Sequence, residues 1–207
     1  MKTFKSLAFP CIAVLFLLLP LAGESTSPAH FNQSESAALL KYARDCLLAR
    51  LDSASMPAPP DFAMKQQRAC FVTFFQGKRV FACYGGFSPR RATLADEISE
   101  NVRLALKNDT RSSRVSRGTA RSAGVQITFP QGQPQRVDDY RSIDPMREGM
   151  LVESGDNGVV FVPGEARTAN WAFREALRRL GAPDPARVWV YRFRAEEIST
   201  RNSRNSL

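Results

Sequence analysis

The chain has 207 residues, of which 43% are apolar and 24% charged, so it can bury the core of one domain or of two small ones. It contains a single histidine, His30, close to a predicted processing site. Ser–His–Asp and Cys–His nucleophiles and imidazole zinc sites need a histidine inside a cleft, so these classes of site are disfavoured. We expect neither a metal site nor a cofactor.

The first 29 residues have the features of an export signal. Lys2 and Lys5 form a basic start, and Leu7–Leu21 is an apolar run of about 15 residues, shorter than the roughly 20 that a spanning helix needs. Ala22 and Gly23 then supply the small residues that a signal peptidase recognises. We predict a cleaved signal peptide over 1–29 and an exported protein, periplasmic or secreted. An uncleaved membrane anchor is the alternative.

Capping residues and hydrophobic periodicity predict the elements that follow the signal. Asn32 and Glu35 form a capping box for a helix over 33–52. Two β-prone runs, 70–75 and 78–84, flank Gln76-Gly77 and predict a tight hairpin. Caps and apolar spacing also predict helices that start after Thr93 and Thr168. Further strands are predicted at 124–129, 150–153, 159–162 and 188–193.

The order of these elements predicts the fold class. Segregated helices with short antiparallel runs are typical of an α+β fold, with a mixed or antiparallel sheet and flanking helices. The folded domain is predicted over 30–198. The residues after it, 199–207, have nothing apolar to bury, so we expect a disordered tail.

A basic stretch between 107 and 121 contributes strongly to the net charge of +9. It contains no aromatic residue, and binders of single-stranded nucleic acid need stacking rings beside their cations, so no nucleic-acid partner is expected. We interpret the stretch as a solvated flexible loop. The alternative is contact with an anionic surface through its arginines, Arg111, Arg114, Arg117 and Arg121.

The hairpin contains two of the four cysteines. If Gln76 and Gly77 are the two loop residues, Cys70 and Cys83 face each other as a non-hydrogen-bonded pair, about 4.5 Å apart between Cα atoms. That separation is at the short end of what a disulfide accepts, and an exported protein would keep such a bond oxidised. We therefore predict a Cys70–Cys83 disulfide. The alternative is a slipped register in which both are small buried side chains.

The residues of this hairpin occur in a distinctive order. Residues 70–74 read Cys-Phe-Val-Thr-Phe, and residues 77–89 include Ala82-Cys83-Tyr84-Gly85-Gly86 before Pro89. This order resembles the signature of the AMMECR-type domain family, a Phe-Val-Thr strand followed by Leu-Arg-Gly-Cys-Ile-Gly and a nearby proline. The resemblance continues over further segments, which are 94–106, 108–111, 149–152, 158–163 and 176–183.

The resemblance implies an α+β fold with a larger and a smaller lobe around a cleft near the signature cysteine, Cys83. The chain also departs from the family pattern. Phe81-Ala82 stand where the family has Arg-Gly, so an arginine fork that could bind an anion is replaced by a phenyl ring. Asp109-Thr110-Arg111 is similar to the family's Asp-Pro-Arg element, without its proline.

Two kinds of function are compatible with these residues. The first is a non-catalytic module of the cell envelope that binds an unidentified ligand or protein partner through Tyr84, Gly85, Gly86 and Arg111. Paired glycines let a ligand approach the backbone, although turn geometry alone would also explain them. The second is a thiol-dependent or redox enzyme with Cys83 as its nucleophile. Without a histidine, Arg79, Arg111 or a helix N-terminus would have to lower the pKa of that thiol.

Overall fold

The computed structural model describes residues 30–181 and 184–201. The chain divides into two compact units, Met1–His30 and Phe31–Leu207, and the helices and strands named below belong to the second. The predicted signal peptide over 1–29 and the last six residues of the predicted tail lie outside the described residues. In the described part of the chain, no helix combines the length and apolar character needed to cross a membrane.

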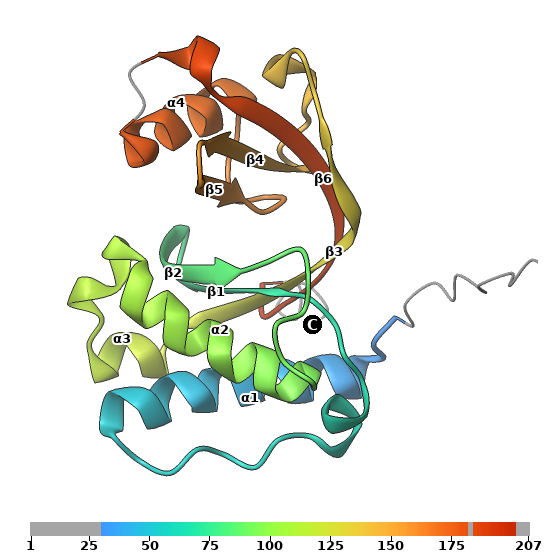
Figure 1. The fold of residues 1–207 in the computed structure, drawn as a ribbon. Helices are drawn as coiled ribbons and strands as arrows, with labels where there is room; N and C mark the ends of the chain where they lie inside the picture. Colours follow the sequence, from blue (N-terminus) through green and yellow to red (C-terminus); the bar gives the residue numbers. More distant parts are fainter. Residues whose placement is uncertain (1–29, 182–183, 202–207) are drawn as a thin grey trace, which may run out of the picture. The chain divides into compact units, whose positions relative to one another are not determined.

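Six antiparallel strands form one curled sheet in the order β2-β1-β3-β6-β4-β5 (Figure 1). The long strand β6 pairs with β4 through its first residues and with β3 along most of its length, so it joins both halves of the sheet. The bounds of the strands are β1 (Phe71–Gln76), β2 (Arg79–Gly85), β3 (Gly124–Arg136), β4 (Gly149–Ser154), β5 (Asn157–Phe161) and β6 (Trp189–Ser199).

The helices divide this unit into two lobes, as predicted, each with its own hydrophobic core. In the larger lobe, α1 and α2 share a core with β1, β2 and the first half of β3, and α3 contacts α1. In the smaller lobe, α4 packs on β4 and β5 (Figure 1). The bounds are α1 (Gln33–Asp52), α2 (Leu94–Asn108), α3 (Arg117–Arg121) and α4 (Ala169–Leu180), with short 3-10 helices η1 (Asp61–Lys65), η2 (Thr110–Arg114), η3 (Tyr140–Ser142) and η4 (Pro185–Arg187).

The predicted helix caps are confirmed. Asn32 and Glu35 bond each other's backbone N–H groups, which is the capping box expected at the start of α1. The hydroxyls of Thr93 and Thr168 each accept the N–H three residues later and so begin α2 and α4. Gly181 ends α4 in the left-handed conformation, with φ of 62°, where glycine has no steric penalty.

Two predictions about irregular segments are wrong. The stretch after α2 is not a flexible loop, because it folds into η2 and α3, and Ala120 of α3 is completely buried. Short helices of this kind carry capping signals but too few residues for an apolar period. The predicted start of the tail at 199 is also wrong, because Ser199 ends β6 and Thr200 hydrogen-bonds with Val125 of β3.

Candidate functional site

A pocket of about 530 Å³ lies between the two lobes. From the larger lobe, β1, β2 and the turn after α2 contribute to its wall, and from the smaller lobe, β5 and α4 do so. Its lining residues are Phe71, Cys83, Tyr84, Gly85, Asn108, Asp109, Thr110, Arg111, Gly158, Val159, Val160, Arg178 and Arg179. The cleft implied by the family resemblance is therefore present beside Cys83.

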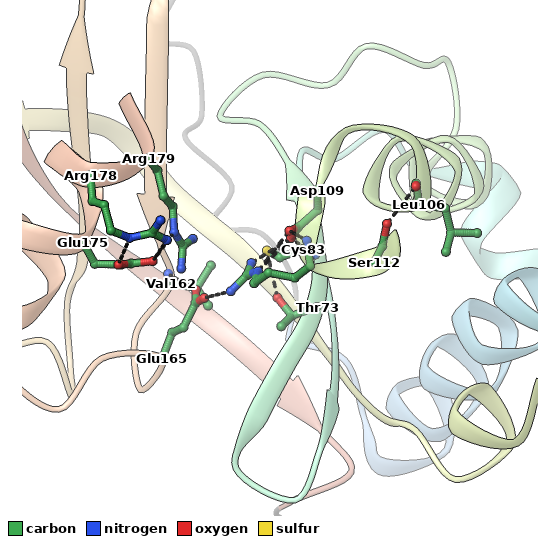
Figure 2. A network of polar contacts seen from close by, with 11 residues as sticks. Thr73, Cys83, Leu106, Asp109, Ser112, Val162, Glu165, Glu175, Arg178 and Arg179 are labelled. Atoms are coloured by element: carbon green, nitrogen blue, oxygen red, sulfur yellow. Dashed lines mark hydrogen bonds and ion pairs between the residues drawn. The ribbon is translucent and has the colours of Figure 1, made fainter. Parts of the chain in front are cut away.

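Arg111 joins the two lobes at this pocket through ion pairs with Asp109 and Glu165, whose side chains are labelled in Figure 2. Its Nη2 donates to Asp109 Oδ2 over 2.7 Å, its Nε lies 3.0 Å from Asp109 Oδ1, and its Nη1 donates to Glu165 Oε1 over 3.1 Å. Burial alone would lower the pKa of Arg111, but the two carboxylates outweigh it and hold the pKa above its usual value. Arg111 is thus a charged contact between segments that lie 54 residues apart in sequence.

The opposite wall of the pocket carries two further guanidinium groups. Arg178 and Arg179 lie in the last turn of α4, and both donate to the carboxylate of Glu175 one turn earlier (Figure 2). The hydrogen bonds from Arg178, and then from Arg179, lower the pKa of Glu175 to about 2, so this carboxylate stays ionised. Glu175 therefore holds two cations at the mouth of the pocket.

Cys83 lies in a half-buried position on the larger lobe's side of the pocket. Its Sγ is 3.2 Å from Thr73 Oγ1, and its backbone N–H donates to Asp109 Oδ2 over 2.9 Å. Burial, reinforced by the negative charge of Glu165, raises the pKa of the Cys83 thiol to about 12. A thiolate nucleophile needs the opposite shift, so these surroundings oppose the thiol-enzyme alternative.

The predicted Cys70–Cys83 disulfide is wrong, because the hairpin has a different register. The two turn residues are Gly77 and Lys78, and Gly77 has φ of 59°. Both favoured two-residue turns need a positive φ at their first position, which glycine adopts more easily than Gln76 does. A bulge after Phe74 then shifts the pairing again, so that Cys83 faces Thr73.

The two cysteines consequently lie on opposite faces of the sheet. Cys83 shares a face of the sheet with its partner Thr73. Cys70 lies three residues before Thr73, and because side chains alternate along a strand, it points to the other face. Cys70 is fully buried in the core of the larger lobe, where its Sγ is 3.5 Å from Asn101 Nδ2. In the described residues, Cys46, Cys70 and Cys83 are all free thiols. The slipped register of the alternative is therefore confirmed, and Cys70 is buried as expected, whereas Cys83 is half-buried.

We predict that Cys70 and Cys83 react slowly in the folded protein. Burial raises the pKa of both thiols to about 12, so iodoacetamide at pH 7.5 should label them at least about 100-fold more slowly than a peptide cysteine. Unfolding without reductant should then allow all three described cysteines to be alkylated. Peptide mapping by mass spectrometry measures both steps. Recovery of a peptide pair linked through residues 70 and 83 would contradict the prediction.

Three of the four predicted ligand-binding residues line the pocket. Tyr84, Gly85 and Arg111 line the pocket, whereas Gly86 does not. Gly85 is required by the sheet itself, because a Cβ there would lie 2.4 Å from the carbonyl oxygen of Cys70 and from the Cα of Phe71. Turn and packing geometry therefore explains Gly85 without a ligand, and the side chain of Arg111 is already engaged by carboxylates.

Three contributors to the site were not predicted from the sequence. Arg178 and Arg179 looked like an ordinary basic end of a helix, which is favourable at any helix C-terminus. Glu165 lies in a turn before α4, and no local pattern around it indicates a partner. Within residues 30–181 and 184–201, no group of three or more His, Cys, Asp or Glu side chains is arranged to hold a metal ion.

The sheet face that carries Cys83 also carries a row of polar side chains, of which three are buried and Glu197 is half-buried. Thr73 of β1 is followed by Gln126 and Thr128 of β3 and by Glu197 of β6, all on one face according to the strand register. Gln126 Nε2 donates to Glu197 Oε1 over 2.9 Å. Burial raises the pKa of Glu197 to about 7, although Arg201 and the Thr128 hydroxyl partly oppose the shift.

The raised pKa of Glu197 predicts a stability that falls as pH rises. Between about pH 4.5 and 7, Glu197 keeps its proton in the folded protein but has lost it in the unfolded chain. The free energy of unfolding therefore falls as the pH rises across this range. Glu197→Gln should remove this slope and raise the free energy of unfolding at pH 8 by roughly 1 to 2 kcal/mol. Urea titrations from pH 5 to 8 measure it. Asp156→Asn, at an exposed carboxylate, is the control, and equal slopes in wild type and Glu197→Gln would contradict the prediction.

Comparisons with known proteins agree with this architecture. The AMMECR1 family model matches residues 40–198. A protein from Thermotoga maritima is 27% identical over 141 residues, which cover 66% of this chain and 80% of that protein. The crystal structure of an uncharacterized protein from Pyrococcus horikoshii has the same fold, with a TM-score of 0.59 and 20% identity over 77% of this chain and 88% of the other. The chain therefore belongs to the AMMECR1 family.

Proposed function

We propose that this protein is a non-catalytic binding module of the cell envelope, and that the pocket between its lobes takes a small anionic ligand. The observation that carries the proposal is the charge of the pocket wall. Arg111, Arg178 and Arg179 line it, and among the described lining residues Asp109 is the only carboxylate. Glu165 and Glu175, which pair with these arginines, are not among the lining residues. Asp109 already accepts hydrogen bonds from Arg111 and from the backbone of Cys83.

The two arginines of α4 retain hydrogen-bonding capacity for such a ligand. Glu175 accepts hydrogen bonds from Nε and Nη2 of Arg178 but only from Nε of Arg179. The other guanidinium N–H groups therefore stay available to a ligand. Because Glu175 holds both side chains in place, less conformational entropy is lost when a ligand binds. Planar guanidinium groups bind carboxylates and phosphates through paired, charge-assisted hydrogen bonds. Both anion types are therefore candidate ligands.

Thermal and chemical unfolding with added anions tests the proposal. A panel of phosphate, sulfate, citrate and acetate should contain at least one anion that stabilises the protein in a saturable way, by about 2.7 kcal/mol at 100 times its Kd. The double variant Arg178→Met/Arg179→Met should abolish this stabilisation. Arg174→Met is the matched control, because Arg174 is exposed on the same helix and does not line the pocket.

Two outcomes would overturn the ligand proposal. The first is the absence of saturable stabilisation by any anion of the panel at 10 mM with wild-type protein. The second is equal stabilisation of wild type and of the double variant, since the anion would then bind elsewhere.

Export is the second component of the proposal. It is supported by the basic start, the short apolar run Leu7–Leu21 and the small residues that follow it. When the full chain is expressed in an export-competent host, the extracytoplasmic fraction should contain a protein whose new N-terminus lies between residues 22 and 30. Intact mass and N-terminal sequencing measure this. An uncleaved chain confined to the cytoplasm would contradict export.

A further inference from the structure

Two long stretches of the chain contain no acidic residue. Residues 62–95 hold neither Asp nor Glu, and neither do residues 110–137. The first stretch includes the β1–β2 hairpin, and the second includes η2, α3 and β3. Nothing in the sequence alone indicates that the basic residues of the two stretches are neighbours.

The tertiary structure places the hairpin turn beside α3. The side-chain amide of Gln76, at the end of β1, donates to Ser122 Oγ directly after α3, over 3.4 Å. One residue earlier, the ring of Phe75 covers Gly124, where a Cβ would lie only 2.1 Å from it. β2 also contacts η2. In Figure 1, the hairpin turn and α3 lie toward the same end of the larger lobe.

Most cations of the hairpin and of the η2–α3 segment have no acidic partner among the described residues. Arg117 is paired with Asp52, and Arg111 with Asp109 and Glu165. The other four are exposed and form no ion pair with any described residue. These four, which we call the basic end, are Lys78 and Arg79 of the hairpin and Arg114 and Arg121 of the η2–α3 segment.

We propose that the basic end binds the surface of an anionic phospholipid bilayer. Unpaired cations in segments that contact one another attract a layer of phosphate groups, and each lysine or arginine near such a layer raises the partition coefficient about fivefold. Among the described residues, neither the hairpin nor the η2–α3 segment contains an exposed large hydrophobic side chain. The protein would therefore adhere to the bilayer surface by electrostatic attraction and not by insertion. This surface is separate from the ligand pocket and does not depend on it.

The composition of the basic end favours a lipid surface over a nucleic acid. Proteins that bind single strands combine their cations with exposed aromatic rings on which bases stack. Of the aromatic residues nearby, Phe74, Phe75 and Phe81 are buried, and residues 107–123 contain none. A lipid headgroup layer requires only an exposed cluster of positive charge.

Vesicle co-sedimentation with the full chain tests the proposal. The vesicles contain equal parts of phosphatidylglycerol and phosphatidylcholine, at 50 mM NaCl, and pure phosphatidylcholine vesicles serve as the neutral reference. One variant is Lys78→Gln/Arg79→Gln/Arg114→Gln/Arg121→Gln. The matched control, Arg141→Gln/Arg147→Gln/Arg174→Gln/Arg187→Gln, removes the same number of exposed charges from other parts of the chain. Circular dichroism melting curves verify that both variants are folded.

The wild type should bind the anionic vesicles and lose this binding at 0.5 M NaCl, because salt screens exposed charges. The basic-end variant should bind at least about 100-fold more weakly, and the control should stay within a few-fold of wild type. All three proteins share Leu7–Leu21, so insertion of that run would appear equally in each and on neutral vesicles.

Three results would overturn the proposal. Equal weakening in both quadruple variants would show that only net charge matters. Failure of the wild type to bind anionic vesicles would exclude the lipid surface directly. Displacement of the vesicles by a single-stranded oligonucleotide at tenfold lower phosphate concentration would show that the basic end is a nucleic-acid surface instead.

Discussion

Replacement of Gly85 by alanine is expected to lower the free energy of unfolding by roughly 3 kcal/mol or more. A Cβ at this position would lie 2.4 Å from the Cys70 carbonyl oxygen and 2.4 Å from the Phe71 Cα. Both are backbone atoms of the neighbouring chain segment, so they cannot rotate away as a side chain could. The strands would have to separate where Gly85 pairs with Phe71. The loss of stability expected from such overpacking lies at the upper end of the usual range.

The adjacent glycine supplies the control for this prediction. A Cβ on Gly86 would approach nothing closer than the carbonyl oxygen of Ser88 at 3.7 Å, so Gly86→Ala should change stability by less than about 0.5 kcal/mol. Guanidinium unfolding curves of the two variants provide the comparison. If Gly85→Ala were as stable as Gly86→Ala, Gly85 would not be constrained by β1.

Replacement of Arg111 by methionine is expected to destabilise the protein by about 3 to 5 kcal/mol, because two nearly buried carboxylates lose their counter-charge. The side chains of Asp109 and Glu165 are only 11% and 5% exposed. Each would keep a backbone N–H donor, from Cys83 and Val162 respectively. The like charges would then face each other across the lobe boundary without the cation between them.

A second substitution separates charge from packing in the Arg111→Met variant. Without the cation, Asp109 and Glu165 repel each other, and removing one of the two charges relieves that repulsion. Adding Glu165→Gln to Arg111→Met should recover part of the loss at pH 7. Arg178→Met, at a side chain that is 71% exposed, should cost less than about 0.5 kcal/mol. Equal stability of Arg111→Met and of Arg111→Met/Glu165→Gln would contradict an electrostatic role.

Local signals in the sequence were sufficient to predict most of the helices and strands. Asn32, Thr93 and Thr168 begin their helices through hydrogen bonds that reach only three residues ahead, so a short stretch of sequence contains the whole signal. The apolar spacing after Thr93 likewise predicted a helix, and Leu94, Ile98, Val102 and Ala105 are buried on one face of it. The strand ends were less accurate, because β3 and β6 extend beyond their apolar cores by pairing with each other.

The hairpin shows how a small local error changes a functional prediction. Placing the turn one residue early, and missing the bulge after Phe74, put Cys70 opposite Cys83. Because side chains alternate between the two faces of a strand, the observed register moves these thiols to opposite sides of the sheet. The preference of glycine for the first turn position was visible in the sequence, whereas the bulge was not.

The sequence by itself determined the α+β class, the helix caps and the family signature, since each depends on residue types that are close together in the chain. Only the tertiary structure decided that Cys83 is a half-buried free thiol, that Arg111 pairs with Glu165, that Arg178 and Arg179 face the same pocket, and that Lys78 and Arg79 lie near α3. Register, ion pairing and surface charge depend on which distant segments meet. That outcome follows from how the whole core packs, and no short pattern of residues contains it.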